Sequence, residues 1–107
     1  MSVSFKEFMK ISFRIGRIIE IEDHPDADKL YVLKVDLGDK TVQLVAGVKL
    51  NYSKEELRDK QIVVLDNLET KSVRGIESQG MLLAADTPDG PIILSPEKKA
   101  PVGSPVR

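Results

Sequence analysis

The chain has 107 residues, of which 41% are hydrophobic and 31% charged, and its 16 basic and 17 acidic side chains leave a net charge of −1. This length suits one domain with a core of its own, and the composition excludes a disordered chain. A nearly neutral chain cannot hold a polyanion by bulk charge, so nucleic-acid binding would have to come from a local basic patch.

The first predicted element is a long strand at residues 11–22. Its apolar residues favour the odd positions, as in a strand with one buried face. The alternation breaks at Arg17, directly after Gly16, which predicts a bulge or a bend there. Such a long, bent first strand can serve both sheets of a small barrel. A turn is expected at residues 24–28, because Pro25 lacks an amide donor and aspartates bond nearby backbone groups.

Two strands joined by a tight hairpin are expected after this turn. In the strand at residues 30–37 every odd position is apolar, so one of its faces should be buried. That face carries four large apolar side chains, which are Tyr31, Leu33, Val35 and Leu37. The sequence Gly-Asp-Lys at residues 38–40 then predicts a short hairpin into a third strand at residues 41–46.

A short helix separates the third strand from the last two. Ser53 and Glu56 have the spacing of a capping box, in which each side chain bonds the backbone N–H of the other, so a helix is expected at residues 53–57. Apolar runs at residues 61–65 and 80–85 predict the fourth and fifth strands. The predicted fold is therefore all-β, with the element order of an OB-fold, a five-stranded Greek-key barrel with one short helix.

The C-terminal part of the chain is rich in proline. Five of the six prolines fall there, around the apolar run Ile92–Leu94. Proline confines such a segment to a sheet edge or a turn. We therefore expect a single domain over residues 1–107, with the barrel at about residues 8–86 and a strand-containing strap outside it at about residues 87–107. An exposed apolar strand needs a cover, and a second copy of the chain is the simplest one, so a homodimer is expected.

Motifs for catalysis and metal binding are missing. The chain has no cysteine, which excludes disulfides, thiolate zinc sites and cysteine catalysis and fits a reducing, cytoplasmic compartment. One histidine, His24, is too few for a typical zinc site, and the aspartates around it lack the spacing of a calcium loop. No apolar run approaches the ~18 residues of a membrane span. We therefore expect no catalytic residue, metal, cofactor or membrane partner, and we interpret His24 as a turn residue.

Two long, irregular stretches carry a more specific signal. Residues 24–38 read HPDADKLYVLKVDLG, and residues 71–85 read KSVRGIESQGMLLAA. In this order they resemble the two signatures of the tRNA-binding domain family, and the resemblance extends from about Phe8 to the C-terminus. That family is found appended to methionyl-tRNA synthetases, in cytokine-precursor cofactors of synthetase complexes and as free-standing tRNA-binding proteins. The resemblance implies an OB-fold that binds tRNA by shape, with little readout of base sequence.

The expected RNA-binding residues come from this resemblance and from charge. They are Arg14, Lys29, Lys71, Arg74, Ser78, Gln79 and Met81. The resemblance implies that Lys29, in the turn before the second strand, contacts phosphate, and that the turn from Ser78 to Met81, before the fifth strand, meets the RNA. The arginines and Lys71 are added because they are the charges best placed to widen that patch. With 5% aromatic residues, binding to the backbone of a folded RNA is favoured over stacking on an aromatic platform.

The predicted function is that of a tRNA-binding auxiliary subunit or appended domain of a methionyl-tRNA synthetase, which delivers tRNA to its catalytic partner. Two alternatives use the same fold. One is a chaperone that binds unfolded polypeptide, and the other is a module that assembles a synthetase complex. Binding to unfolded polypeptide without RNA would identify the first, and partner binding that survives loss of the basic residues would identify the second.

Overall fold

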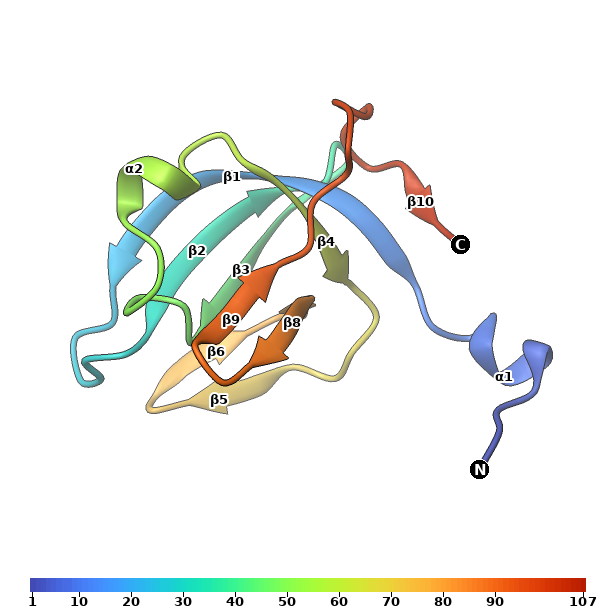
Figure 1. Ribbon diagram of the computed structural model, residues 1–107, viewed down its shortest axis with the longest axis horizontal. Coiled ribbons are helices and arrows are strands. Elements are labelled where there is room, and N and C mark those ends of the chain that lie inside the picture. The colour runs from blue at the N-terminus through green and yellow to red at the C-terminus, as the bar shows by residue number, and fades with distance from the viewer.

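A strongly curved antiparallel sheet forms the body of the molecule (Figure 1), in a computed structural model that describes residues 1–107. In chain order the elements are α1 (Phe5–Phe8), β1 (Phe13–Asp23), β2 (Tyr31–Asp36), β3 (Thr41–Ala46), α2 (Lys54–Leu57), β4 (Gln61–Leu65), β5 (Lys71–Val73), β6 (Ile76–Ser78), β7 (Met81–Leu82), β8 (Ala84–Thr87), β9 (Gly90–Ile93) and β10 (Pro105–Val106). The strand order in the main sheet is β3-β2-β1-β4-β7. Its ends meet where the N–H of Gln79 donates to the carbonyl of Gln43 over 2.7 Å. The predicted five-stranded, OB-type barrel is therefore confirmed.

β1 runs through both halves of the barrel, since its first part pairs with β4 and its second part with β2. β1 packs tightly against the core at Gly16, where an added Cβ would lie 2.5 Å from Cγ1 of Val35. The irregularity expected near Gly16 and Arg17 lies further along, because the register with β2 shifts between Ile18 and Glu20. A bulge changes which side of the strand faces the core, so alternation alone could not locate it.

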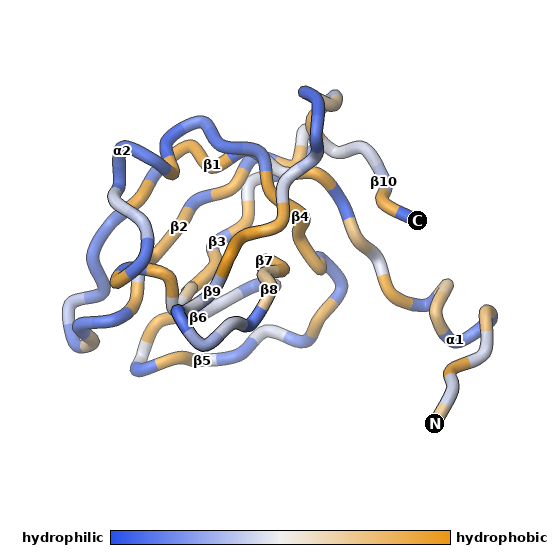
Figure 2. Tube along the Cα trace, viewed as in Figure 1, coloured by the Kyte–Doolittle hydropathy of each residue, from blue (hydrophilic) through white to orange (hydrophobic).

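The core lies inside the barrel, where β1 to β4 supply most of the apolar side chains (Figure 2). The four residues predicted to share one face of the second strand are all buried, namely Tyr31, Leu33, Val35 and Leu37. The predicted capping box is also present. The N–H of Ser53 donates to the Glu56 carboxylate over 2.9 Å, and the N–H of Glu56 donates to the Ser53 hydroxyl over 3.1 Å. This box starts α2 at the position that buries Leu57 completely in the core.

Residues 66–94 differ most from the expectation. β5 and β6, for which the sequence predicted no strands, pair as a separate hairpin. The single strand expected at residues 80–85 is divided, because β7 pairs with β4 whereas β8 pairs with β9. Ile93 is 7% exposed and belongs to the core, while Ile92 and Leu94 are exposed. The apolar run expected outside the barrel thus contributes one side chain to its interior, since neighbours on a strand point to opposite faces.

The segment after β9 returns along β1. The side-chain amide of Gln61 holds it through two hydrogen bonds to the backbone of Ala100, at 2.6 and 2.9 Å. The N–H of Gly103 then donates to the carbonyl of Ile15 over 2.7 Å, and β10 pairs with β1. Both chain ends therefore lie at one end of the molecule, far from the β1–β2 turn and from β5 and β6 (Figure 1). Neither helix has the length and apolar character needed to cross a bilayer.

Candidate functional site

The β5–β6 hairpin ends in a two-residue turn. Val73 pairs with Ile76, so Arg74 and Gly75 alone form the turn. Both have positive φ, 53° at Arg74 and 88° at Gly75, as a type I′ turn requires. Glycine adopts this conformation freely, whereas a left-handed backbone costs a residue such as arginine about 1 kcal/mol. The turn thus holds a cation at the hairpin tip although asparagine or glycine would be more stable there.

Side-chain hydrogen bonds join the end of this hairpin to β3. The Ser78 hydroxyl accepts from the N–H of Val45 over 3.0 Å and donates to the carbonyl of Gly80 over 3.1 Å. The Gln79 side-chain carbonyl accepts from the N–H of Gln43 over 2.8 Å. Ser78 is also only 6% exposed. Of these two residues expected at the RNA, Ser78 is buried with its hydroxyl bonded within the protein, whereas Gln79 is exposed and bonds β3 through its side-chain oxygen.

Lys29 and Arg74 line the same cleft, although they come from separate segments. The cleft lies between the β1–β2 connection and the hairpin tip, and its other walls are Ala27, Asp28 and Leu30. Both cations are exposed, and neither takes part in any of the ion pairs of the structure. Asp28 is the single acidic residue on the walls. Two free cations at one cleft give it the charge that a phosphate group needs.

Lys71 and Met81 line a second pocket, which is also formed in part by the hairpin. Leu68 and Glu69 contribute to its walls. Met81 is 47% exposed, as expected for a residue at a binding surface, and Lys71 is exposed without an ion pair. We use the name hairpin surface for these two residues together with the two cations of the cleft, that is, for Lys29, Lys71, Arg74 and Met81.

Arg14 lies outside the hairpin surface and is bound within the protein. Its guanidinium donates to the carboxylates of Asp39 at 2.8 Å and Asp66 at 3.3 Å, and to the carbonyls of Leu37 at 2.9 Å and Gly103 at 3.3 Å. The hydrogen bond with Asp39 is the main cause that raises the pKa of Arg14, and the same bond lowers the pKa of the Asp39 carboxyl. Arg14 thus clamps the C-terminal segment to the β2–β3 hairpin.

Part of the acidic charge near the cleft is neutralised within the protein. Asp23 forms ion pairs with Lys49 at 3.3 Å and with Lys54 at 3.5 Å. The hydrogen bond from Lys49 is the main cause that lowers the pKa of Asp23. These pairs reduce the negative charge that a phosphate would meet beside Lys29. Nowhere in the chain do three or more metal-ligating side chains come together.

His24 is the buried residue between the two parts of the site. Its side chain is 4% exposed, with Nε2 3.0 Å from the carbonyl oxygen of Val73 and Nδ1 3.0 Å from the backbone nitrogen of Asp26. The sequence predicted a turn residue, and the contact with the hairpin could be found only after the hairpin itself had been recognised. The sequence signal for that hairpin was weak, because Arg-Gly is not among the dipeptides typical of a two-residue hairpin turn.

We expect Arg74→Asn to stabilise the protein, because asparagine tolerates the positive φ of this turn better than arginine does. The free energy of unfolding should rise by about 0.5–1 kcal/mol in urea denaturation. The matched control is Arg74→Ala, which removes the same charge but keeps a side chain that disfavours positive φ. Equal midpoints for the two variants would contradict turn geometry as the cause.

The known proteins that resemble this chain include a methionine–tRNA ligase, a MetRS related protein and a chaperone. Residues 13–105 match the family described as “Putative tRNA binding domain”. The chain is 55% identical over 105 residues to the methionine–tRNA ligase of Pyrococcus furiosus, a match that covers 98% of the chain but 14% of that ligase. The MetRS related protein from Pyrococcus horikoshii superimposes with a TM-score of 0.92 at 32% identity, covering 100% of this chain and 99% of that one. The CsaA chaperone protein from Picrophilus torridus also superimposes with a TM-score of 0.92, at 31% identity and coverages of 99% and 100%.

Proposed function

Because the chain belongs to the tRNA-binding domain family, we propose that it binds tRNA through the hairpin surface. The observation that carries this proposal is the cleft that Lys29 and Arg74 line without ion-pair partners. Phosphate groups of a folded RNA would bind in the cleft, and Lys71 would extend the contact along β5. Contacts of this kind recognise the shape of the backbone and carry little information on base sequence.

Base stacking on aromatic side chains has no place in the proposed mode. Tyr31 is buried, and its hydroxyl donates to the carbonyl of Tyr52 over 2.8 Å, while the Tyr52 hydroxyl accepts from the N–H of Ile93 over 3.0 Å. Phe5 and Phe8 belong to α1, at the opposite end of the molecule from the hairpin (Figure 1). Binding should therefore be mainly electrostatic and should weaken steeply as salt is added.

We further infer that the chain supplies tRNA affinity to a larger protein and performs no catalytic step itself. Supporting this, it is similar to a small part of a methionine–tRNA ligase, and the chain itself matches a binding-domain family over residues 13–105. A domain that holds tRNA beside a catalytic unit raises the local tRNA concentration without adding catalytic contacts. The proposed partner is the catalytic subunit of a methionyl-tRNA synthetase in the cytoplasm, and the role needs no metal or cofactor.

Titration with unmodified bulk tRNA at several salt concentrations tests the proposed function. We expect salt-sensitive binding that duplex DNA does not displace, because the surface should recognise folded RNA by its shape. Absence of binding at low salt would exclude tRNA as the ligand. If duplex DNA displaced the tRNA as well as unlabelled tRNA does, the binding would be general polyanion binding and would not depend on the shape of RNA.

A protein-binding chaperone is the second candidate, and the similarity to the CsaA chaperone protein supports it. Exposed apolar side chains such as Phe5, Ile92 and Leu94 would then contact unfolded polypeptide. The distinguishing measurement is binding of a permanently unfolded polypeptide in the absence of RNA. A chaperone would bind it with little salt dependence, and charge changes in the hairpin surface would leave that binding unchanged.

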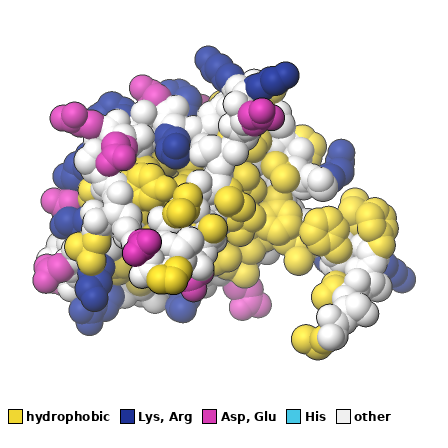
Figure 3. All heavy atoms as spheres, in the orientation of Figure 1, with side chains coloured by type: hydrophobic (Ala, Val, Ile, Leu, Met, Phe, Trp, Pro, Cys, Tyr) yellow, Lys and Arg dark blue, Asp and Glu magenta, His cyan; other side chains and the backbone are white.

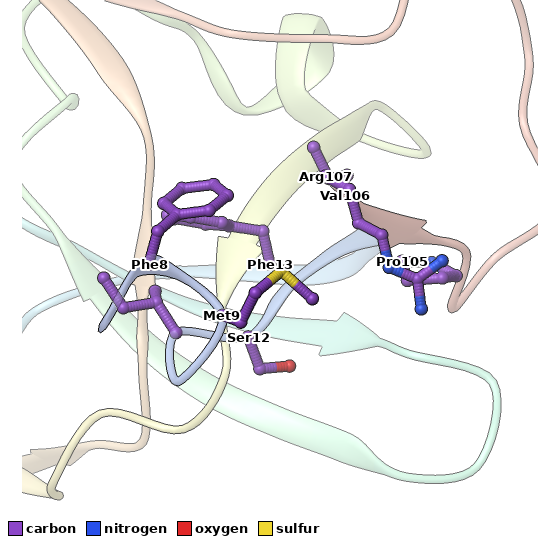
Figure 4. A pocket seen from close by; sticks show the side chains of 8 residues that line it. Phe8, Met9, Ser12, Phe13, Pro105, Val106 and Arg107 are labelled. Atoms are coloured by element: carbon purple, nitrogen blue, oxygen red, sulfur yellow. The ribbon is translucent and has the colours of Figure 1, made fainter. Parts of the chain in front are cut away.

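We also propose a homodimer, formed through the end of the molecule that carries α1 and β10. Apolar side chains gather there on the surface (Figure 3). The pocket in Figure 4 is lined by Phe8, Met9, Ile11, Ser12, Phe13, Pro105, Val106 and Arg107. The rings of Phe8 and Phe13 pack with their centroids 6.2 Å apart. A second copy would cover this face, and the C-terminal strap would take part through its last strand, β10.

Phe5→Glu combined with Met9→Glu should convert the dimer into a monomer. The two side chains are 76% and 49% exposed, so charges there should oppose association without disturbing the core. The molar mass from light scattering gives the result. The comparison is Ile92→Glu with Leu94→Glu, which places two charges on the apolar run of the strap that the sequence predicted to be the interface; it should leave a dimer formed through α1 and β10 intact. A dimer that is lost in this comparison variant and kept in the α1 variant would assign the interface to β9.

A further inference from the structure

We infer that His24 is a positioning residue for tRNA binding: its imidazole holds the β5–β6 hairpin against the β1–β2 connection, so that Lys29 and Arg74 form one phosphate-binding cleft. The inference rests on the proposed function and adds to it a residue that touches no RNA. His24 is 4% exposed, which leaves its ring out of reach of a bound RNA.

The two hydrogen bonds of His24 fix the tautomer of its ring. The backbone nitrogen of Asp26, 3.0 Å from Nδ1, can only donate, so Nδ1 carries no proton. The carbonyl oxygen of Val73, 3.0 Å from Nε2, can only accept, so Nε2 carries the proton. The imidazole is therefore neutral, and each of its nitrogens holds a different segment.

The bond to Val73 fixes the outer strand of the hairpin. β6 is joined to β3, because the Gln43 amide donates to the carbonyl of Glu77 over 2.8 Å and Ser78 bonds the backbone of β3. β5, by contrast, pairs only with β6. Apart from this pairing, the hydrogen bond between Val73 and His24 is the one hydrogen bond that joins β5 to the rest of the barrel. Val73 directly precedes Arg74, so this link lies at the base of the turn. Without it, the hairpin could twist about β6 and carry Arg74 away from the cleft.

On its other side, His24 orders the turn that carries Lys29. Its ring accepts from the N–H of Asp26, and the backbone N–H of His24 donates to the carbonyl of Leu30 over 3.1 Å. Lys29 thus lies in a turn whose first and last residues, Asp26 and Leu30, are both hydrogen-bonded to His24. Cations held in place before binding lose less conformational freedom when the ligand arrives, so a cleft built in this way should bind phosphate more tightly than two mobile side chains.

Two substitutions distinguish the effect of the His24–Val73 hydrogen bond, which holds the hairpin, from that of the His24–Asp26 hydrogen bond within the turn. In His24→Asn, the side-chain carbonyl can still accept from the N–H of Asp26 but is too short to reach Val73. In His24→Gln, the terminal amide can donate to the carbonyl of Val73, whereas the bond to Asp26 is lost. We expect tRNA affinity to fall about three- to tenfold in the asparagine variant, with faster amide hydrogen exchange in β5, and to fall by a smaller factor in the glutamine variant, which loses only the bond within the turn. Equal losses in both variants, or a loss confined to glutamine, would overturn the role of the link.

A double-mutant cycle gives a readout that lower stability alone would not change. In the unaltered chain, Lys29→Ala and Arg74→Ala should weaken tRNA binding non-additively, because both cations contact one phosphate. In the His24→Asn background the two effects should become additive. Additive effects in the unaltered chain would overturn the shared cleft. If the unaltered chain binds no tRNA, the proposed function and the phosphate cleft both fail, whereas hydrogen exchange in β5 still decides whether His24 holds the hairpin.

Discussion

Lys71→Glu combined with Arg74→Glu should lower tRNA affinity roughly tenfold or more at low salt and should flatten the salt dependence. Both side chains are exposed and form no ion pair, so their reversal removes two phosphate contacts and breaks no bond within the protein. Each phosphate contact contributes about one unit to the slope of log K against log salt, so the slope should fall by one to two units. Fluorescence anisotropy with labelled tRNA at several salt concentrations measures both quantities.

The matched control is Lys98→Glu with Lys99→Glu, which changes the net charge by the same amount. These lysines are exposed and precede Ala100, which Gln61 holds at the start of β4. Their reversal should leave the slope unchanged. Equal losses in the two double variants would point to bulk charge instead of the hairpin surface. An unaffected slope in the hairpin variant, with synthetase binding preserved, would support the assembly module.

Arg14→Met should lower the free energy of unfolding by about 2 kcal/mol or more, which corresponds to a fall of roughly 10 °C in Tm. The change leaves the carboxylate of Asp66, whose side chain is 8% exposed, without its cation, and it leaves the carbonyls of Leu37 and Gly103 without a donor. Thermal unfolding measures the loss. Because Arg14 lies outside the hairpin surface, tRNA affinity below the transition should stay unchanged.

Arg17→Met provides the comparison for this variant. Arg17 pairs with Asp59 at 2.7 Å and with Asp36 at 3.8 Å, but its side chain and that of Asp59 are 39% and 67% exposed. Ion pairs in solvent contribute little, so this change should cost less than about 1 kcal/mol. If Arg14→Met proved as stable as Arg17→Met and lost tRNA affinity, Arg14 would belong to the RNA surface, as its charge first suggested.

Elements with a strong local pattern could be predicted from the sequence. The second strand has apolar residues at every second position, so that they share one face. Ser53 and Glu56 are three residues apart, which lets each side chain accept a hydrogen bond from the backbone N–H of the other. The order of these elements was enough for the OB-type barrel, because few all-β folds place one short helix between the third and fourth strands. Each of these signals spans a few residues, so no knowledge of distant contacts was needed.

The hairpin of β5 and β6 escaped prediction because its turn residues are unusual. A type I′ turn is signalled most strongly by Asn-Gly or Asp-Gly, whereas this chain has Arg74 and Gly75. Its strands are also mostly exposed, with Ser78 as the single buried residue, so the apolar alternation is weak. The hairpin is held in place by side chains of His24 and Gln43, which are distant in the sequence.

The role of a charged or polar side chain was harder to predict than its position. Arg14 and Arg74 look alike in the sequence, but Arg14 meets Asp39 and Asp66, which lie 25 and 52 residues away. Ser78 stands in the turn expected to meet RNA, but its hydroxyl is enclosed by β3. Such roles depend on long-range contacts, which local spacing does not contain.

The placement of the two chain ends bears on how this domain can be attached to other polypeptides. Both ends lie beside α1 and β10, at the opposite end of the molecule from the β1–β2 turn and the hairpin tip (Figure 1). A linker joined to either terminus would leave the domain at this end, away from the hairpin surface proposed to bind tRNA. The domain could therefore be fused in either order, and a flexible tether would leave the proposed tRNA-binding surface accessible.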